Sequence, residues 1–393
     1  MKRVYLDHIA ATPLRPEALE AMRPFLAEAF GNPRSTHSHG QRAAEAVEAA
    51  REEVAGLVGA SPAEIVFTAS GSEANNLAVK GLALGQQARG RHIVVSAIEH
   101  TSVLNAVKAL ERHGFSSTLV PVDGDGRVDP AEVEKALIPE TVLVSVMTAN
   151  SEVGTIEPVT EIAAVCRSRR VLFHTDAVAA AGNIPFDVKA MGVDALSLAG
   201  DQFYGPKGSA ALYVRRGVRI LPLVDGGIQA GGRRAGTENV AGLVGLGRAA
   251  ALARAEMAAR TAALVPLRDR LLDELPRRIE HVRVTGSRTD RLPHHASVCV
   301  EFVEGEGMLL HLDMNGFAVS SGSACTSRSL KVSHVLLAMG LDHAAAQGSL
   351  VFSLIDGTTE ADIEAFLEAF PPIVARLRGM SPLYTQYLKN RGS

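Results

Sequence analysis

Two glycine-rich stretches of the chain have the composition of anion-binding sites. The first, Thr68 to Asn76 (TASGSEANN), follows an apolar β-rich run and precedes a helix-like segment. Backbone N–H groups and serine hydroxyls at the start of a helix can bind a phosphate group. The second, Asp225 to Asn239, contains five glycines beside Arg233, Arg234 and Thr237. Each stretch also has a plainer interpretation, a simple turn for the first and a flexible surface loop for the second.

Two titratable residues stand where a predicted strand gives way to a helix or loop. Asp176 ends the run VLFHTD, and His100 precedes a helix-like segment. In α/β proteins, ligands bind at the carboxyl ends of the strands, so both side chains are candidates for a binding site. Each could instead cap the helix that follows.

Cys325 is the best candidate for a nucleophile. It lies in a stretch of small residues, Ser320 to Ser327, where a structural thiol would have no apolar neighbours. Cys166 and Cys299 lie in an apolar helix face and a predicted strand, so we assign both to packing. The three cysteines are spaced too widely for a metal or redox pair, and their odd number argues against a disulfide framework.

The histidine pairs 37/39 and 294/295 could suggest a metal site. The sequence supplies no third ligand beside either pair, so we expect solvated histidines instead.

These candidates need a scaffold, and the chain predicts one. Short apolar runs alternate with helix-like segments, as in a parallel sheet with helices on both faces. The predicted strands are 65–68, 92–97, 117–122, 142–147, 171–177, 195–200 and 209–214.

The C-terminal part has a different texture. A long helix is predicted over 248–280, followed by an α+β region with strands near 296–302 and 349–354 and a frayed tail. We therefore expect a large domain over 16–250 and a smaller one formed by 1–15 and 251–393.

Composition limits the class of protein. The chain has 393 residues, 47% hydrophobic and 21% charged, with a net charge of -3 spread along the sequence. We expect no nucleic-acid partner, because no basic stripe is present. No signal peptide or membrane-spanning run is evident, which predicts a cytoplasmic protein without membrane association.

The motifs taken together resemble the NifS/IscS-type cysteine desulfurases, a class V branch of the fold-type I pyridoxal-phosphate enzymes. The matching stretches run through nearly the whole chain, in the order YLDHIAATPL, GNPRSTHSHG, FTASGSEANNLAV, SAIEHTSVL, ANSEVGTIEP, HTDAV, YGPKG, RRAGTENV, AVSSGSACTS and SHVLLAMGL. The resemblance implies a fold-type I transferase fold, with a mostly parallel seven-stranded sheet in the large domain and a smaller α+β domain.

The resemblance also implies roles for individual residues. Cys325 would take sulfur from the substrate as a persulfide. The cofactor would be held by residues with separate tasks: Asp176 at the pyridine nitrogen, His100 stacked on the ring, Gly71 and Ser72 at the phosphate, Thr237 reaching that phosphate from the partner subunit, and Asn150 near ring and substrate.

The chain departs from the family pattern where the cofactor would be attached. The family reads Ser-x-Ser-Gly-His-Lys-x-Tyr-Gly-Pro-Lys-Gly, and here Gln202 stands at the Schiff-base lysine. An amide can neither condense with an aldehyde nor carry a proton between carbon atoms. Asp201 and Ala199 replace the adjacent histidine and a phosphate-contacting serine. Lys207 belongs to a separate family position and is a poor substitute.

Further departures concern the ring and the substrate. Ala179 replaces the glutamine that contacts the phenolic oxygen of the cofactor. Val351 and Asp356 stand where the family has the arginines of Arg-Phe-Ser-Leu-Gly-Arg, one of which clamps the substrate carboxylate. Because an arginine clamp attracts that carboxylate and an aspartate repels it, we expect cysteine to bind poorly.

Three interpretations remain open. In the first, the chain is a desulfurase-like homodimer of sulfur or iron–sulfur metabolism that acts with a scaffold or sulfur-acceptor protein. Cys325 then carries sulfur or ligates an iron–sulfur cluster, and pyridoxal phosphate, if bound, is held non-covalently with at best weak desulfurase activity. In the second, it is a non-catalytic docking partner without the cofactor. In the third, it performs a different reaction on another ligand, with Asp201, Gln202 and Asp356 lining a changed pocket.

Overall fold

The computed structural model describes residues 3–322 and 332–391 of the chain. A seven-stranded sheet forms the centre of its larger part, with strand order β2-β8-β7-β6-β5-β3-β4. Six strands run parallel to one another, and β8 is antiparallel to both of its neighbours, β2 and β7. The strands are β2 (Ile65–Thr68), β3 (His92–Ser96), β4 (Ser116–Val120), β5 (Thr141–Ser145), β6 (Leu172–Asp176), β7 (Ala195–Ala199) and β8 (Ala210–Val214).

All seven strands expected from the sequence are therefore present, and the predicted mostly parallel sheet is confirmed. The apolar runs that predicted these strands are clear in the sequence because both faces of the sheet are covered. Strands such as β2, β3, β5 and β7 are buried at every residue, which favours mainly apolar runs.

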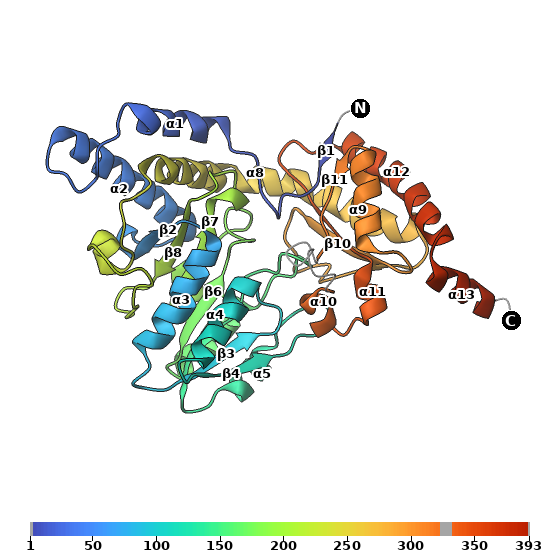
Figure 1. Cartoon of the computed structure of the whole chain (residues 1–393), viewed down its shortest axis with the longest axis horizontal. Coiled ribbons are helices and arrows are strands. Elements are labelled where there is room, and N and C mark those ends of the chain that lie inside the picture. Colours follow the sequence, from blue (N-terminus) through green and yellow to red (C-terminus); the bar gives the residue numbers. More distant parts are fainter. Residues whose placement is uncertain (1–2, 323–331, 392–393) are drawn as a thin grey trace.

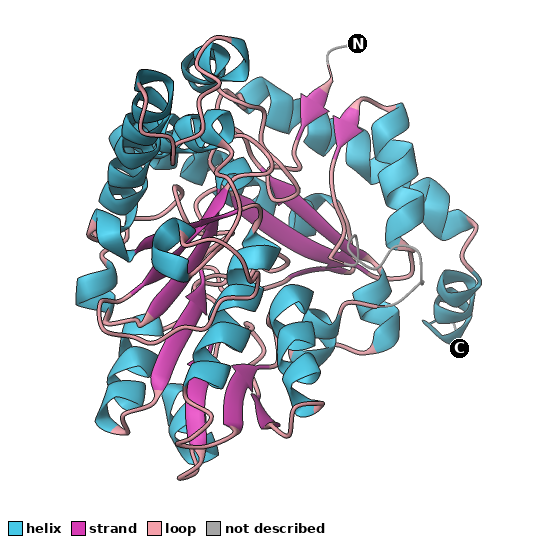
Figure 2. Ribbon diagram, turned by 60° about the vertical axis from the view of Figure 1, so that its left-hand side comes forward, coloured by secondary structure: helices cyan, strands magenta, loops and turns pink. Residues whose placement is uncertain are grey.

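Helices cover this sheet and connect its strands (Figures 1 and 2). They are α1 (Pro16–Ala27), α2 (Ser38–Val58), α3 (Gly71–Gly85), α4 (Thr101–Glu111), α5 (Pro130–Ala136), α6 (Val159–Ser168) and α7 (Val188–Met191). Short 3₁₀ turns lie at η1 (Pro62–Glu64), η2 (Gly200–Gln202) and η3 (Gln229–Gly232).

The smaller part is built on an antiparallel sheet of order β12-β10-β9 and a parallel pair β1-β11. Its strands are β1 (Val4–Tyr5), β9 (Val282–Val284), β10 (His295–Val300), β11 (Phe317–Ala318) and β12 (Ser349–Ser353). Its helices are α9 (Gly305–Met314), α10 (His334–Ala338), α11 (His343–Gln347), α12 (Glu360–Gly379) and α13 (Pro382–Arg391). The expectation of a frayed tail was wrong, because α13 continues as a helix to Arg391.

The long helix α8 (Val240–Arg278) joins the two parts (Figure 1). It begins earlier than expected, and its apolar side chains serve two separate cores. Leu246 and Ala250 belong to the core beside the large sheet, whereas Leu271 and Leu275 belong to the core beneath β10 and β12. A single rigid helix therefore fixes how the loops of the two parts meet.

Within the described chain, no helix is both long enough and apolar enough to cross a membrane.

Candidate functional site

A cavity of about 670 Å³ lies where the carboxyl ends of the large-sheet strands face the smaller part. Its walls come from the segments after β2, β3, β5, β6 and β7, and from residues 320–322, 332–335 and 351. Six residues singled out from the sequence meet there, namely Gly71, Ser72, His100, Asn150, Asp176 and Gln202. This position agrees with the rule that α/β folds bind ligands at the carboxyl ends of their strands.

The first turn of α3 offers free backbone donors to the cavity. Ser70 caps the helix by accepting a hydrogen bond from the Glu73 N–H (3.1 Å). The N–H groups of Gly71 and Ser72 have no acceptor within the described chain. A Cβ on Gly71 would lie 2.7 Å from Cγ2 of Val178, so only glycine lets the backbone sit this close. The turn can therefore bind a phosphate group through its N–H donors and the helix dipole.

Asp176 lies at the end of β6 and is 5% exposed. Its Oδ1 accepts the N–H of Val178 (2.9 Å), and its Oδ2 accepts a hydrogen bond from Nδ2 of Asn75 (2.6 Å). Burial raises the pKa of this carboxyl, whereas the Val178 N–H, His100 and Asn75 act in the opposite direction. A buried carboxylate held by such donors can pair with a protonated ring nitrogen of a bound ligand.

A hydrogen-bonded relay connects Asp176 to His100. Asn75 Nδ2 also donates to Oγ of Ser102 (2.9 Å), and that hydroxyl lies 2.7 Å from Nδ1 of His100. The backbone N–H of Ser102 donates to the same ring nitrogen (3.1 Å). Since Nδ1 accepts these bonds, the neutral imidazole carries its proton on Nε2. Asn75 and Ser102 lie within the stretches TASGSEANN and SAIEHTSVL, but their residue types alone predict no role for them.

Glu99 is a buried acid at the cavity wall that no sequence pattern singled out. It is fully buried; its Oε1 accepts the N–H of Met147 (2.7 Å), and its Oε2 has no partner within the described chain. Burial and the nearby Asp176 raise the pKa of Glu99 well above its ordinary value. Burial therefore disfavours a negative charge on Glu99.

Asn150 lines the cavity, but its amide is occupied by its own turn. Its Oδ1 accepts the N–H groups of Glu152 and Val153, and its Nδ2 donates to the Ile98 carbonyl (3.0 Å). These bonds hold the loop after β5 in place.

Gln202 is fixed at the cavity wall and is 5% exposed. The backbone carbonyl oxygen of Gln202 lies 2.9 Å from Nε2 of His8 and accepts a longer hydrogen bond from Nδ2 of Asn183. Its side-chain Nε2 donates to the Ile9 carbonyl (3.1 Å), whereas its Oε1 has no partner within the described chain.

Three other positions lie away from the cavity or beyond the described residues. Thr237 is exposed and does not line the cavity of its own chain, and Lys207 is likewise exposed and outside it. Cys325 falls in 323–331, outside the described residues. Cys166 and Cys299 are each 1% exposed, which confirms their assignment to packing.

Asp356 does not line the pocket, so that part of the third interpretation was wrong. It pairs with Arg15 (3.0 Å), and its N–H donates to the hydroxyl of Tyr204 (2.7 Å). Val351, in contrast, lines the cavity and is 3% exposed. Of the two positions where the family pattern has arginine, only 351 faces the site, because alternate residues of a strand point to opposite faces and Asp356 lies beyond the end of β12.

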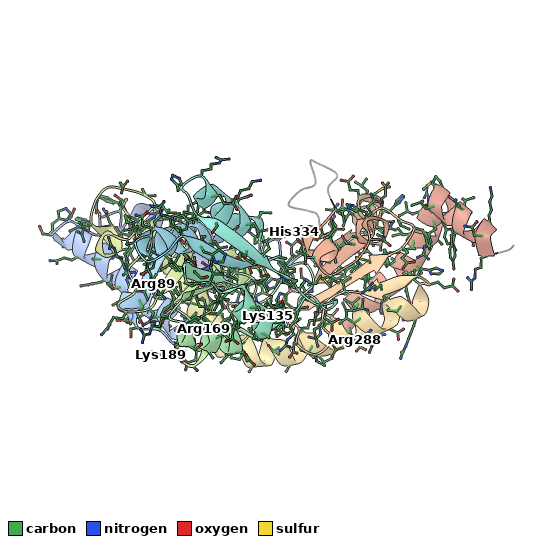
Figure 3. All side chains as sticks on the ribbon, turned by 90° about the horizontal axis from the view of Figure 1, so that it is seen from below. Arg89, Lys135, Arg169, Lys189, Arg288 and His334 are labelled. Atoms are coloured by element: carbon green, nitrogen blue, oxygen red, sulfur yellow. The ribbon has the colours of Figure 1, made fainter. Side chains whose placement is uncertain are left out.

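The described walls of the cavity are rich in acids. They include Glu99, Glu152, Asp176 and Asp201, together with His100 and His334, but no lysine or arginine of the described chain. The basic side chains labelled in Figure 3 (Arg89, Lys135, Arg169, Lys189 and Arg288) line no part of it, whereas the labelled His334 does. His334 spans the two parts of the chain, since its Nε2 lies 3.0 Å from the Glu99 carbonyl.

The two histidine pairs differ in burial, since His37 and His39 are exposed. His294 and His295 are buried rather than solvated, so that expectation was wrong for this pair. His294 stacks on His8 with a centroid distance of 4.3 Å, and burial lowers its pKa well below the ordinary value. No group of three metal-ligating side chains occurs in the described part of the chain.

Glu157 supplies a prediction for stability. It is 4% exposed; its Oε2 accepts the Val128 N–H (2.8 Å), its Oε1 is unpaired, and burial raises its pKa from 4.5 to about 8. Because the folded protein holds this proton more tightly than the unfolded chain, stability falls as pH rises from about 4.5 to about 8. We expect Glu157→Gln to be more stable than wild type at pH 9, by at least about 1 kcal/mol, and similar at pH 5. Urea unfolding at the two pH values measures this, and an equal difference at both would contradict it.

Comparisons with known proteins agree with this architecture. The aminotransferase class-V family model matches residues 4–366. The chain is 47% identical over 394 residues to "Cysteine desulfurase IscS" of Dictyoglomus turgidum, covering all of both chains. It is also 47% identical to the protein of that name from Methanosarcina thermophila, covering 97% of this chain and 94% of that one.

Solved structures agree as well. A "NIFS-LIKE PROTEIN" superposes with a TM-score of 0.90 at 37% identity, covering 95% of this chain and all of the other. The apo cysteine desulfurase of Thermococcus onnurineus NA1 gives 0.84 at 25% identity, covering 95% of both chains. With its seven-stranded sheet, its cavity and full-length identity of this extent, the chain belongs to the aminotransferase class-V family as a homologue of the IscS cysteine desulfurases.

Proposed function

We propose that this chain is a desulfurase-like protein of sulfur or iron–sulfur cluster metabolism that binds pyridoxal phosphate without a covalent bond and has weak or no desulfurase activity. The observation that carries the proposal is Gln202 at the wall of a cavity that otherwise suits the cofactor.

The residues present suit the phosphate and the ring. The free N–H groups of Gly71 and Ser72 suit the phosphate, and the close packing of Gly71 on Val178 leaves the backbone accessible there. Asp176, held by Asn75, suits a protonated ring nitrogen, and His100 has its outer nitrogen free to carry a proton. When bound, the cofactor would act as an electron sink for bonds at a substrate carbon.

The residues do not suit covalent attachment. In the family pattern the lysine that binds the aldehyde stands at 202, and here an amide occupies that position. Gln202 is held by the carbonyl of Ile9 and cannot act as a general base. Lys207 is exposed and outside the cavity, which makes it no replacement.

The visible absorption spectrum of purified protein tests this proposal. We expect added pyridoxal phosphate to give colour that dialysis removes and that borohydride does not fix to the chain at the cavity. Colour that survives dialysis and becomes covalent at one lysine after reduction would contradict non-covalent binding. A protein that stays colourless would instead favour the non-catalytic interpretation.

Cys325 is the proposed carrier of sulfur, or a ligand of an iron–sulfur cluster shared with a scaffold or sulfur-acceptor protein. The support is its sequence context and the relatives named as cysteine desulfurases. Thiolates are the usual ligands of such clusters.

A second candidate function is that of a docking partner without catalysis. It is favoured by Val351 and by the lack of a described lysine or arginine in the cavity walls, since neither an amino-acid carboxylate nor an aldehyde finds its usual partner there. A changed reaction on another ligand would use Asp201 and Gln202, which do line the cavity.

We also propose a homodimer. Large apolar side chains are exposed on and after α1 and in the segment before η3; they are Leu26, Phe30, Leu223, Val224 and Ile228, with exposed fractions from 37% to 74%. Apolar surface of this kind marks association. The dimer would also let Thr237 approach the cavity of the other subunit.

Sedimentation at micromolar concentration is expected to show a dimer for wild type. Replacing Phe30 (74% exposed) and Ile228 (71% exposed) with glutamate should shift the protein toward monomer, because each buries a charge in the interface. Leu310→Glu, on α9 and 68% exposed, is the matched control and should stay dimeric. A monomeric wild type would contradict the proposal.

A further inference from the structure

The environment of Gln202 favours one chemical form of the cofactor over the other. The two common phosphorylated forms share the ring and the phosphate and differ at the 4′ carbon. One bears an aldehyde, which only accepts hydrogen bonds, and the other bears an aminomethyl group, which is a cation with three N–H donors at neutral pH. The groups lining position 202 therefore decide which form is bound.

The groups at that position are acceptors. Oε1 of Gln202 has no partner, and the Ile9 carbonyl, on the same wall, already receives its one bond from Nε2 of Gln202. Asp201, next in the chain, also lines the cavity. Oε1 is itself buried, so accepting a bond from a ligand requires the amide to turn about its broad terminal torsion; Nε2 then gives up its bond to the Ile9 carbonyl, which becomes a second acceptor. A buried acceptor without a partner gains most from a charged donor.

The rest of the described cavity adds to this preference. Asp176, Glu99 and Glu152 raise the count of acidic groups, and no described lysine or arginine offsets them. Burial raises the pKa of Glu152 to about 7 and raises that of Glu99 well above its ordinary value, so a cationic ligand would favour their ionised forms. An ammonium group gains from this setting, whereas an aldehyde gains nothing.

From these contacts we infer that the cavity binds pyridoxamine 5′-phosphate in preference to pyridoxal 5′-phosphate, with Gln202 as the acceptor for its amine. The inference rests on the proposed function, because it takes the phosphate turn and Asp176 as the ends of a vitamer site. It adds the identity of the form bound.

Equilibrium binding tests this with three ligands: pyridoxamine phosphate, pyridoxal phosphate and 4-deoxypyridoxine 5′-phosphate. The third keeps ring and phosphate but carries a methyl group, so it neither donates hydrogen bonds at 4′ nor reacts with surface lysines. Calorimetry of the wild-type dimer in an amine-free buffer is expected to give pyridoxamine phosphate an affinity at least about tenfold above each of the others, as one charge-assisted hydrogen bond implies.

Variants locate the preference. Gln202→Met keeps the volume and removes the acceptor, and it should lower affinity for pyridoxamine phosphate by about tenfold while changing that for 4-deoxypyridoxine phosphate less than about threefold. Gln202→Glu keeps an acceptor and should retain the preference. Lys207→Met is the control, since Lys207 is exposed and outside the cavity, and it should bind all three as wild type does.

The outcomes distinguish failure of the amine preference from failure of the proposed cofactor site. Equal affinity for the amine and methyl ligands, or tighter binding of the aldehyde, overturns the inference and leaves the vitamer site standing. A failure of all three ligands to bind overturns both. A preference for the amine that survives in Gln202→Met overturns the role given to Gln202.

Discussion

Gln202→Lys is expected to bind pyridoxal phosphate covalently and yet to remain at least about a hundredfold slower than its relatives in releasing sulfur from cysteine. The lysine would restore attachment and a base, which together act on rate by factors of about a hundred to ten thousand. The substrate carboxylate would still meet Val351, which is apolar and 3% exposed. Groups that act as a unit do not contribute additively, so the single change restores only part of the site.

Two double variants test which position binds the substrate carboxylate. Gln202→Lys with Val351→Arg should exceed the single variant by at least about tenfold, because residue 351 lines a cavity with room for the longer side chain. Gln202→Lys with Asp356→Arg is the matched control. Position 356 pairs with Arg15 outside the cavity, so this second arginine should give no gain.

Sulfide release under single-turnover and steady-state conditions measures all three variants. Family-like activity in Gln202→Lys alone would show that the site lacks nothing else. A gain from Asp356→Arg equal to that from Val351→Arg would contradict the assignment of the substrate end to residue 351.

Cys325→Ser is expected to abolish sulfur transfer to an acceptor and any co-purifying cluster, with almost no change in the free energy of unfolding. A serine hydroxyl forms neither a persulfide nor a thiolate ligand. The neighbouring residues in the sequence are small, so we expect the substitution to remove little packing. The native protein should also react with a thiol reagent at Cys325 well before the other two cysteines.

Cys299→Ser serves as the control with the opposite pattern. Cys299 is 1% exposed in β10, and burial raises its thiol pKa to about 12, so it is unreactive in the folded protein. Its replacement should cost about 1–3 kcal/mol through an unpaired buried hydroxyl and leave transfer per folded molecule unchanged. A Cys325 that is labelled only after unfolding, or a large loss of stability in its serine variant, would make that thiol structural.

Several buried acidic groups, some of them at the cavity, make the stability of this chain depend on pH. Asp7, Glu99, Glu152 and Glu157 all have pKa values raised by burial. Each makes the folded state less stable as pH rises through its range. The contribution of these four carboxyls should therefore decline as pH rises toward 8, whereas the buried His8, His174 and His295, whose pKa values burial lowers, add stability as pH rises to about 6.5. The variant at Glu157 isolates the effect of one carboxyl.

The sequence by itself determined the large sheet and the family. Most strands of that sheet are short, largely apolar runs that are buried along their whole length, and this pattern is local. It also determined that the chain carries an amide at 202 and a valine at 351, since the motifs around them are continuous stretches. The rule for strand ends made Asp176 and His100 candidates for one binding site, the start of a helix did so for Gly71 and Ser72, and only the family resemblance singled out Gln202.

Only the tertiary structure decided how these side chains are partnered. Asn75 and Asp176 lie 101 residues apart in the sequence. No local sequence pattern predicts that the Asn75 amide joins Asp176 to Ser102 and, through Ser102, to His100. Three features depend on how distant segments pack together. They are the burial of His294, the unpartnered Oε1 of Gln202 and the pairing of Asp356 with Arg15. Local patterns record which face of an element is apolar, whereas a polar atom finds its partner only when distant segments are packed together.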